Sequence, residues 1–116
     1  GVDMAVLHNL MRNPIDGESI EFNDNRLSLY SAQKGKCAVT GKQMEADEVI
    51  CIKKIPKEQG GTDKYSNLLL VCRKIQELLN VKDIKTFSEE MDKLNLDKKQ
   101  SDKLLKLRSL AFVESR

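Results

Sequence analysis

Residues 48–80 read EVICIKKIPKEQGGTDKYSNLLLVCRKIQELLN. Residues 48–55 are rich in Val and Ile, which favour a β-strand, and a proline ends that run. After a Gly-Gly loop, the short and strongly apolar residues 67–72 predict a second strand. Residues 73–80 predict a short helix with three apolar side chains facing inward, Ile75, Leu78 and Leu79. The order strand, loop, strand, helix therefore predicts a small ββα unit.

Two helices are expected before this unit. Residues 3–12 have apolar side chains at helical spacing, and the Asn-Pro pair that follows stops the helix. A second helix is predicted to begin near Asn23 or Asp24, both good N-caps, and to end near Gly35. Residues 37–42 then predict a tight turn, since a glycine at its fifth position can adopt positive φ.

Two more helices are expected after the unit. Thr86 with Glu89 fits a capping box, and so does Asp97 with Gln100. The predicted fold class is α+β, a ββα module flanked by helices from both termini. Three segments make up one compact domain: an N-terminal helical segment (1–35), the module (36–82) and a C-terminal helical segment (83–116).

Composition narrows the class of protein. The chain has 116 residues, of which 40% are hydrophobic and 33% charged. No apolar run approaches the ~18 residues of a membrane-spanning helix, and the first ten residues do not resemble a secretory signal. Three cysteines, an odd number, argue against a disulfide framework and for a reducing compartment. We therefore expect a cytoplasmic protein without a membrane partner.

The net charge of +2 conceals an uneven distribution. Residues 1–30 carry two basic and five acidic side chains, a balance of −3. Residues 31–82 carry ten basic and six acidic side chains, a balance of +4, and residues 83–116 are close to neutral. Only the middle segment is therefore a candidate for electrostatic binding to nucleic acid.

Several stretches resemble the HNH module of bacterial group II intron-encoded reverse transcriptase/maturases, together with its flanks. They read GKCAVTGK (35–42), KIPKEQGGTDKYSNL (54–68), NDNRLSLYSAQ (23–33), and LDKKQ with KLR (96–100 and 106–108). The resemblance covers roughly residues 9–111. It implies that the chain is the C-terminal end of a much larger protein whose polymerase and maturase regions are absent here.

The resemblance also implies where the chemistry should be. An HNH nuclease holds a divalent metal in a ββα fold, with paired histidines at the end of the first strand as ligand and general base. Those positions are Ile52 and Lys53 in this chain. The asparagine that pins the hairpin is retained as Asn67. The two helix histidines, four residues apart, are replaced by Gln76 and Asn80.

These replacements predict an inactive nuclease. Ile52 has no lone pair, and neutral amide oxygens hold Mg²⁺ or Zn²⁺ poorly without carboxylates or imidazoles. Lys53 could act as a base only with a strongly depressed pKa. No cofactor is therefore expected, and Mg²⁺ or Zn²⁺ would be required only if the module were an active metal-dependent endonuclease.

A basic cluster surrounds the degenerate positions, with two readings left open. Its members are Lys53, Lys54, Lys57, Lys64, Arg73 and Lys74. Positive charge alone can bind phosphates, without a metal. Alternatively, the cluster is an ordinary solvated surface. Lys53 favours phosphate binding, because it would place a cation where the metal charge is missing.

The three cysteines also allow two readings. Cys37, Cys51 and Cys72 are predicted on the turn and the two strands, where they could meet around zinc. However, structural zinc is nearly always four-coordinate, and the second position of the turn motif is Thr40 instead of a cysteine. Three small buried thiols are therefore the preferred interpretation.

The function expected from the sequence is that of a degenerate HNH endonuclease domain that still binds target DNA. Expected partners are DNA, with group II intron RNA as a second candidate, and the rest of the parent reverse transcriptase/maturase. The alternative is a structural module that docks on the parent protein or on intron RNA through the apolar faces of residues 86–111. The sequence specifies neither the target strand nor the oligomeric state.

Overall fold

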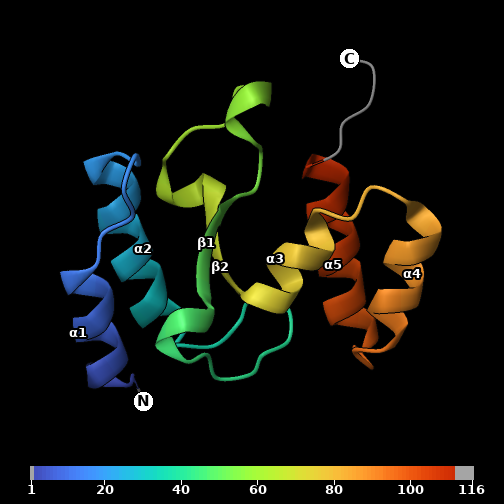
Figure 1. The fold of residues 1–116 in the computed structure, drawn as a ribbon, viewed down its shortest axis with the longest axis horizontal. Helices are drawn as coiled ribbons and strands as arrows, with labels where there is room; N and C mark the ends of the chain where they lie inside the picture. The colour runs from blue at the N-terminus through green and yellow to red at the C-terminus, as the bar shows by residue number, and fades with distance from the viewer. Residues whose placement is uncertain (1, 112–116) are drawn as a thin grey trace.

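The computed structural model describes residues 2–111 of the chain. Within that range the fold is mixed α+β, with five α-helices and one two-stranded antiparallel sheet. The helices are α1 (Met4–Arg12), α2 (Ile20–Ala32), α3 (Arg73–Leu79), α4 (Ile84–Asp92) and α5 (Lys98–Ala111), and the strands are β1 (Val49–Lys53) and β2 (Leu68–Cys72). The sheet lies between α1 and α2 on one side and α3, α4 and α5 on the other (Figure 1).

The hairpin and its helix confirm the predicted order of strand, loop, strand and helix. β1 pairs with β2 in antiparallel register from Val49↔Cys72 to Lys53↔Leu68. β2 runs directly into α3, whose apolar side chains Ile75, Leu78 and Leu79 are buried as predicted. The strands are shorter than expected because residues 46–48 and 65–67 form 3-10 turns at their starts.

The two faces of the hairpin pack against different helices. Paired residues of an antiparallel ladder point to the same side, and successive pairs alternate. Cys51 and Lys53 therefore face α2, where the Lys53 ammonium lies 4.7 Å from the centre of the Phe22 ring. Ile52 faces α3 and α5 instead, and lines a pocket with side chains from both helices. β1 thus separates two chemically different environments.

The N-terminal helices differ from prediction in one boundary. α2 begins at Ile20, earlier than expected, because Ser19 is the N-cap and its hydroxyl accepts a hydrogen bond from the Phe22 amide at 2.9 Å. Asn23 is not the cap: its side chain binds both backbone groups of Ile15 and so holds the connection from α1. The helix ends at Ala32, and the Gly35 amide closes its end on the Tyr30 carbonyl.

Residues 37–42 form the predicted tight turn. The Cys37 amide donates to the Lys42 carbonyl and the Gly41 amide to the Cys37 carbonyl, both at 2.9 Å. Gly41 has φ of +71°, the left-handed value that its place in the turn requires. The Ala38 amide donates to the Leu70 carbonyl, so the turn is fixed to the outer edge of β2.

The C-terminal helices confirm one predicted cap and correct the other. Asp97 and Gln100 bind each other's backbone amides at the start of α5, at 2.8 and 3.0 Å. α4 begins at Ile84 instead of after Thr86, because Asp83 is the N-cap. Thr86 lies inside the helix and donates its amide and hydroxyl to the Asp83 carboxylate. Asp83 was therefore the better candidate for the N-cap of this helix.

The buried core draws on all three segments of the chain. Its largest fully buried side chains include Leu10, Tyr30, Leu70, Ile75, Phe87 and Leu104. The N-terminal helices are linked to each other by Arg26, which is 4% exposed and donates to the carbonyls of Leu10 and Asn13.

Among the residues described, no helix combines the length and apolar character needed to cross a membrane.

Candidate nucleic-acid interface

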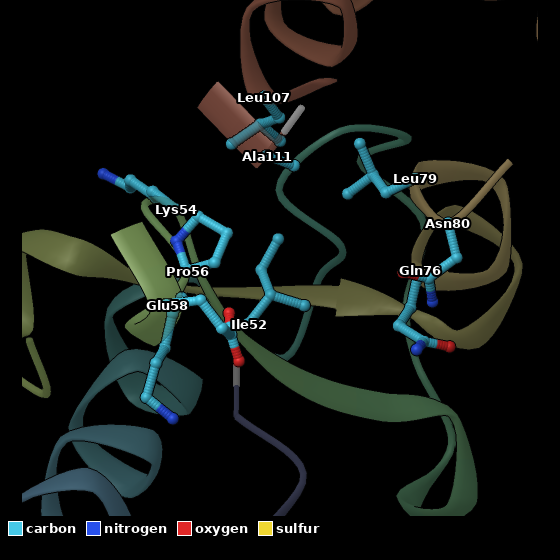
Figure 2. Close-up of a pocket in the computed structure, with 10 residues that line it drawn as sticks. Ile52, Lys54, Pro56, Glu58, Gln76, Leu79, Asn80, Leu107 and Ala111 are labelled. Carbon is cyan, nitrogen blue, oxygen red and sulfur yellow. The ribbon is translucent and has the colours of Figure 1, made fainter. Parts of the chain in front are cut away.

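A pocket of about 280 Å³ opens where the end of β1 meets α3 and α5 (Figure 2). It is lined by Ile52, Lys53, Lys54, Pro56, Glu58, Gln76, Leu79, Asn80, Leu107 and Ala111. In Figure 2, Ile52 lies in the middle, with the side chains of Gln76 and Asn80 to one side and those of Lys54 and Pro56 to the other. Leu79 and the end of α5 close it on a further side.

Four of the five degenerate positions meet in this pocket. Ile52 reaches it because alternate residues of β1 face α3. Gln76 and Asn80 reach it together because residues four apart lie one turn apart on a helix. Lys53 contributes to the same wall. The sequence motif thus identified a real cavity, although Leu107 and Ala111 on α5 were not anticipated.

The side chains of the pocket do not fit a divalent metal. Ile52 offers no donor atom, and Gln76 and Asn80 offer only neutral amides. Across the described residues, no group of three or more His, Cys, Asp or Glu side chains is arranged to hold a metal ion. Glu58 is the one carboxylate that lines the pocket, so a divalent cation would lack the further carboxylate or imidazole ligands that it requires.

Asn67, the fifth position, lies outside the pocket and holds the loop between the strands. Its Nδ2 donates to the carbonyls of Ile55 and Thr62 at 3.1 and 2.8 Å, and its Oδ1 accepts from the Ile55 amide at 3.0 Å. This confirms the expected backbone bonding. Gly61 completes the closure, because an added Cβ would lie 1.6 Å from the Ile55 carbonyl oxygen. This close approach was not predicted from the sequence.

The Lys53 ammonium is directed to the α2 side of β1 and is paired there. It lies 3.0 Å from a Glu18 carboxylate oxygen and 3.6 Å from one of Asp63, over the Phe22 ring. Burial lowers the pKa of Lys53, but hydrogen bonding and attraction from Glu18 and Asp63 outweigh it and leave the pKa raised. A raised pKa is the opposite of what a lysine base needs.

The other predicted cations fall into two groups. Arg73 donates to the Asp47 carbonyl at 2.6 Å, and Lys74 lies 3.5 Å from Glu90. By contrast, Lys54, Lys57 and Lys64 have no ion pair within residues 2–111. All three lie on the loop that Asn67 holds between the strands. We call them the loop lysines; they are the lysines of the predicted cluster whose charge no carboxylate pairs with in the described residues.

Two of the three cysteines are in contact. The Cys37 sulfur accepts from the amides of Cys72 at 3.3 Å and Thr40 at 3.5 Å. A hydrogen bond from the Cys72 thiol is the main reason why the pKa of Cys37 is lowered to about 5, and the same contact raises the pKa of Cys72. Burial raises the pKa of Cys51 to about 12. The three thiols do not form a cluster that could hold zinc in the part of the chain described.

No protein-family model matches this chain, and no curated protein or solved structure does so either.

Several residues of the site could not have been found from the motif. Glu18 and Asp63 flank Lys53 from positions 35 and 10 residues away, and neither belongs to a spacing pattern that predicts the contact. Leu107 and Ala111 reach the pocket from more than 50 residues beyond β1. Only the amphipathic pattern of residues 104–110 hinted that α5 packs on the module.

Proposed function

We propose that this chain is a degenerate HNH-like module of the group II intron reverse transcriptase/maturase type, which binds nucleic acid without cutting it. The observation that carries the proposal is the meeting of the Ile52, Gln76 and Asn80 side chains in one pocket, which Lys53 also lines while its ammonium is directed to the other side of β1. These are the positions at which the sequence resemblance expects ligands and base. Nothing in their own side-chain chemistry would bring them together, so their convergence supports the ββα alignment.

The arrangement of the hairpin supports the same proposal. β1 and β2 form an antiparallel pair, α3 follows β2 without a linker, and α3 packs on the face that carries Ile52. Asn67 pins the intervening loop, as the asparagine of an HNH module is expected to do. Cleavage is not part of the proposal, because Glu58 is the one carboxylate that lines the pocket, no imidazole accompanies it, and Lys53 is held in its charged form.

Binding is assigned to the loop lysines Lys54, Lys57 and Lys64. Lys57 and Lys64 are exposed and Lys54 is half-buried. Lysines without a carboxylate partner displace the counterions condensed on phosphates, which gives affinity without sequence selectivity. Lys53 differs, since Glu18 and Asp63 already neutralise its charge. We therefore place the phosphate contacts on the loop and not at the former base position. DNA is the proposed partner, with intron RNA and the remainder of a parent protein as further ones, in the cytoplasm.

The test is salt-dependent binding of a 20-bp DNA duplex, measured by fluorescence anisotropy. We expect weak binding, on the order of 10⁻⁴–10⁻⁶ M at physiological salt, with a log–log salt slope of about −0.9 per phosphate contact. The Lys54→Ala/Lys57→Ala/Lys64→Ala variant should lose two to three such contacts, roughly two units of slope. A control variant, Lys85→Ala/Lys99→Ala/Lys103→Ala, removes the same charge from exposed positions on α4 and α5.

Equal slopes for the two triple variants would contradict the assignment to the loop. The nuclease part is tested separately, by incubating supercoiled plasmid with Mg²⁺, Mn²⁺ or Zn²⁺. We expect no nicked product from the unaltered chain. Nicking that is lost in Lys53→Ala would contradict the inactive reading and make Lys53 a base.

A docking role is the second candidate, and the structure changes where it could operate. The apolar faces of residues 86–111 cannot serve as the main surface, because Phe87, Leu104 and Leu107 are buried in the chain's own core. On the C-terminal helices Ile84 and Leu105 are exposed, but more of the exposed apolar side chains lie near the N-terminus, at Met4, Met11, Ile15 and Ile20. Ile20 is 82% exposed although it begins α2. A docking partner would therefore be expected on α1 and the start of α2.

A further inference from the structure

We infer that the pocket between β1, α3 and α5 receives one unpaired nucleobase from the nucleic acid held by the loop lysines. The inference rests on the proposed function and assigns a ligand to the same site. It would give a specific role to positions that have lost their metal chemistry.

The size of the pocket limits the ligand to a single ring system. Its volume of about 280 Å³ lies just below the ~300–1,000 Å³ of pockets that hold drug-sized ligands. A paired duplex cannot enter a space of this size. A base taken out of its stack can, and proteins commonly hold such bases between apolar side chains.

The walls match the two faces of a flat ring. Ile52 and Pro56 lie toward the strand, while Leu79 and Leu107 approach from the helices, as Figure 2 shows. These aliphatic side chains can cover both faces of a base and exclude water from its edge. The same walls suit a sugar less well, because its hydroxyl groups would be left unpaired against them.

The polar edge is supplied by the amides of Gln76 and Asn80. Neither side chain has a hydrogen-bond partner within residues 2–111, although both line the pocket. A carboxamide presents a donor beside an acceptor, and this pair complements the adjacent amino group and ring nitrogen of adenine. Asn80 is exposed and Gln76 is half-buried, so both amides bond to water in the free chain and can exchange that water for the edge of a base.

Charge near the pocket places the phosphates on the opposite side. Lys54 lies across from the amides, and its ammonium points away from the cavity (Figure 2). The phosphate attached to an inserted base could meet Lys54 while the base edge meets Gln76 and Asn80. Glu58 also lines the pocket, and its carboxylate disfavours a second phosphate there. The strand would therefore enter from the loop and present one nucleotide at a time.

The experiment compares three DNA duplexes that differ at one position. One carries a single bulged deoxyadenosine, one a bulged abasic site, and one is fully paired. We expect the adenosine bulge to bind about tenfold more tightly than the other two, the scale of one well-made amide–base contact. The Gln76→Leu/Asn80→Leu variant should lose that preference. A control variant, Asn9→Leu/Gln43→Leu, makes the same changes at exposed positions outside the pocket and should keep it.

A second measurement does not depend on variants. Titration of the ¹⁵N-labelled chain with the adenosine-bulge duplex should shift the side-chain NH₂ signals of Gln76 and Asn80, and the abasic duplex should not. Equal affinities for all three duplexes, with the salt slope retained, would overturn the base pocket and leave the proposed function standing. Failure of every duplex to bind would overturn both.

Discussion

The two sides of β1 make an instructive contrast. On the α2 side, the Lys53 ammonium has three partners: the carboxylates of Glu18 and Asp63 and the ring of Phe22. On the α3 side, Ile52 faces a cavity whose polar side chains, Gln76 and Asn80, have no partner among the described residues. Adjacent residues of one strand thus lie in different environments. The first environment links β1 to α2 and the loop, and the second is an open pocket.

The largest effect on stability is expected in the loop between β1 and β2, which carries residues next to both sides of β1. Gly61→Ala would bring a Cβ to 1.6 Å from the Ile55 carbonyl oxygen, so the backbone must move and the bonds to Asn67 weaken. We expect the free energy of unfolding to fall by about 3 kcal/mol. Gly17→Ala is the comparison for backbone conformation alone: Gly17 has φ of +82° with open space around it, whereas Gly61 is limited by the close approach, and the Gly17 change should cost about 1 kcal/mol. Similar losses in urea titrations of the two variants would argue against the close approach.

A designed change on the open side should have the next largest effect. If Ile52, Gln76 and Asn80 converge as described, replacing all three by histidine should create a zinc site. Zinc at one hundred times its Kd would then stabilise the variant by about 2.7 kcal/mol, seen as a higher Tm. The unaltered chain should show no such rise. If zinc does not raise the Tm of the histidine variant, the three positions do not face one another.

A smaller effect on stability is expected from a change on the α2 side of β1, where Lys53 is paired. Lys53→Met keeps the apolar stem but removes the ammonium from Glu18, Asp63 and Phe22. The loss should be about 1 kcal/mol, because partly exposed ion pairs and cation–π contacts are each modest. The same truncation across the strand, Gln76→Met, should change stability by less than about 0.5 kcal/mol. An equal loss for both variants would remove the contrast between the two sides.

The pH dependence of that loss gives the smallest but most specific signal. The pKa of Lys53 is raised in the folded chain, so its contribution is complete below the ordinary lysine pKa of ~10.4. It should disappear as the pH rises through the higher native pKa. The stability gap between the unaltered chain and Lys53→Met should therefore be constant from pH 7 to 9 and narrow toward pH 11. A gap that narrows below pH 9 would indicate a lowered pKa instead.

Local signals in the sequence predicted the elements well. The hairpin, α3, the tight turn at 37–42 and the Asp97–Gln100 capping box all depend on residues close together in the chain, where propensity and spacing are informative. The two wrong helix starts were also local. At each, an earlier cap, Ser19 or Asp83, was available, and the residue expected to cap took another role.

Contacts between distant segments could not be predicted in the same way. The Lys53–Glu18 ion pair joins residues 35 apart and depends on how α2 packs across the sheet. Lys53 was predicted to bind phosphate because it would place a cation where the metal charge is missing, and its two carboxylate partners were not foreseen. The α5 wall of the pocket is a similar case, since an amphipathic pattern predicts that a helix packs but not where.

The attachment of α5 has a consequence for recognition. Near its start, the Gln100 side chain donates to the Thr40 carbonyl at 3.2 Å, and at its end the Ala111 carbonyl accepts from Gln59 at 3.1 Å. The helix is therefore anchored to the turn at 37–42 and to the loop between the strands, at opposite ends of its length. A ligand that binds beside Leu107 would enter a preorganised pocket, so the protein would lose little conformational entropy on binding. Selectivity between ligands would then depend on how well each fits the pocket, and we expect that selectivity to depend only weakly on temperature.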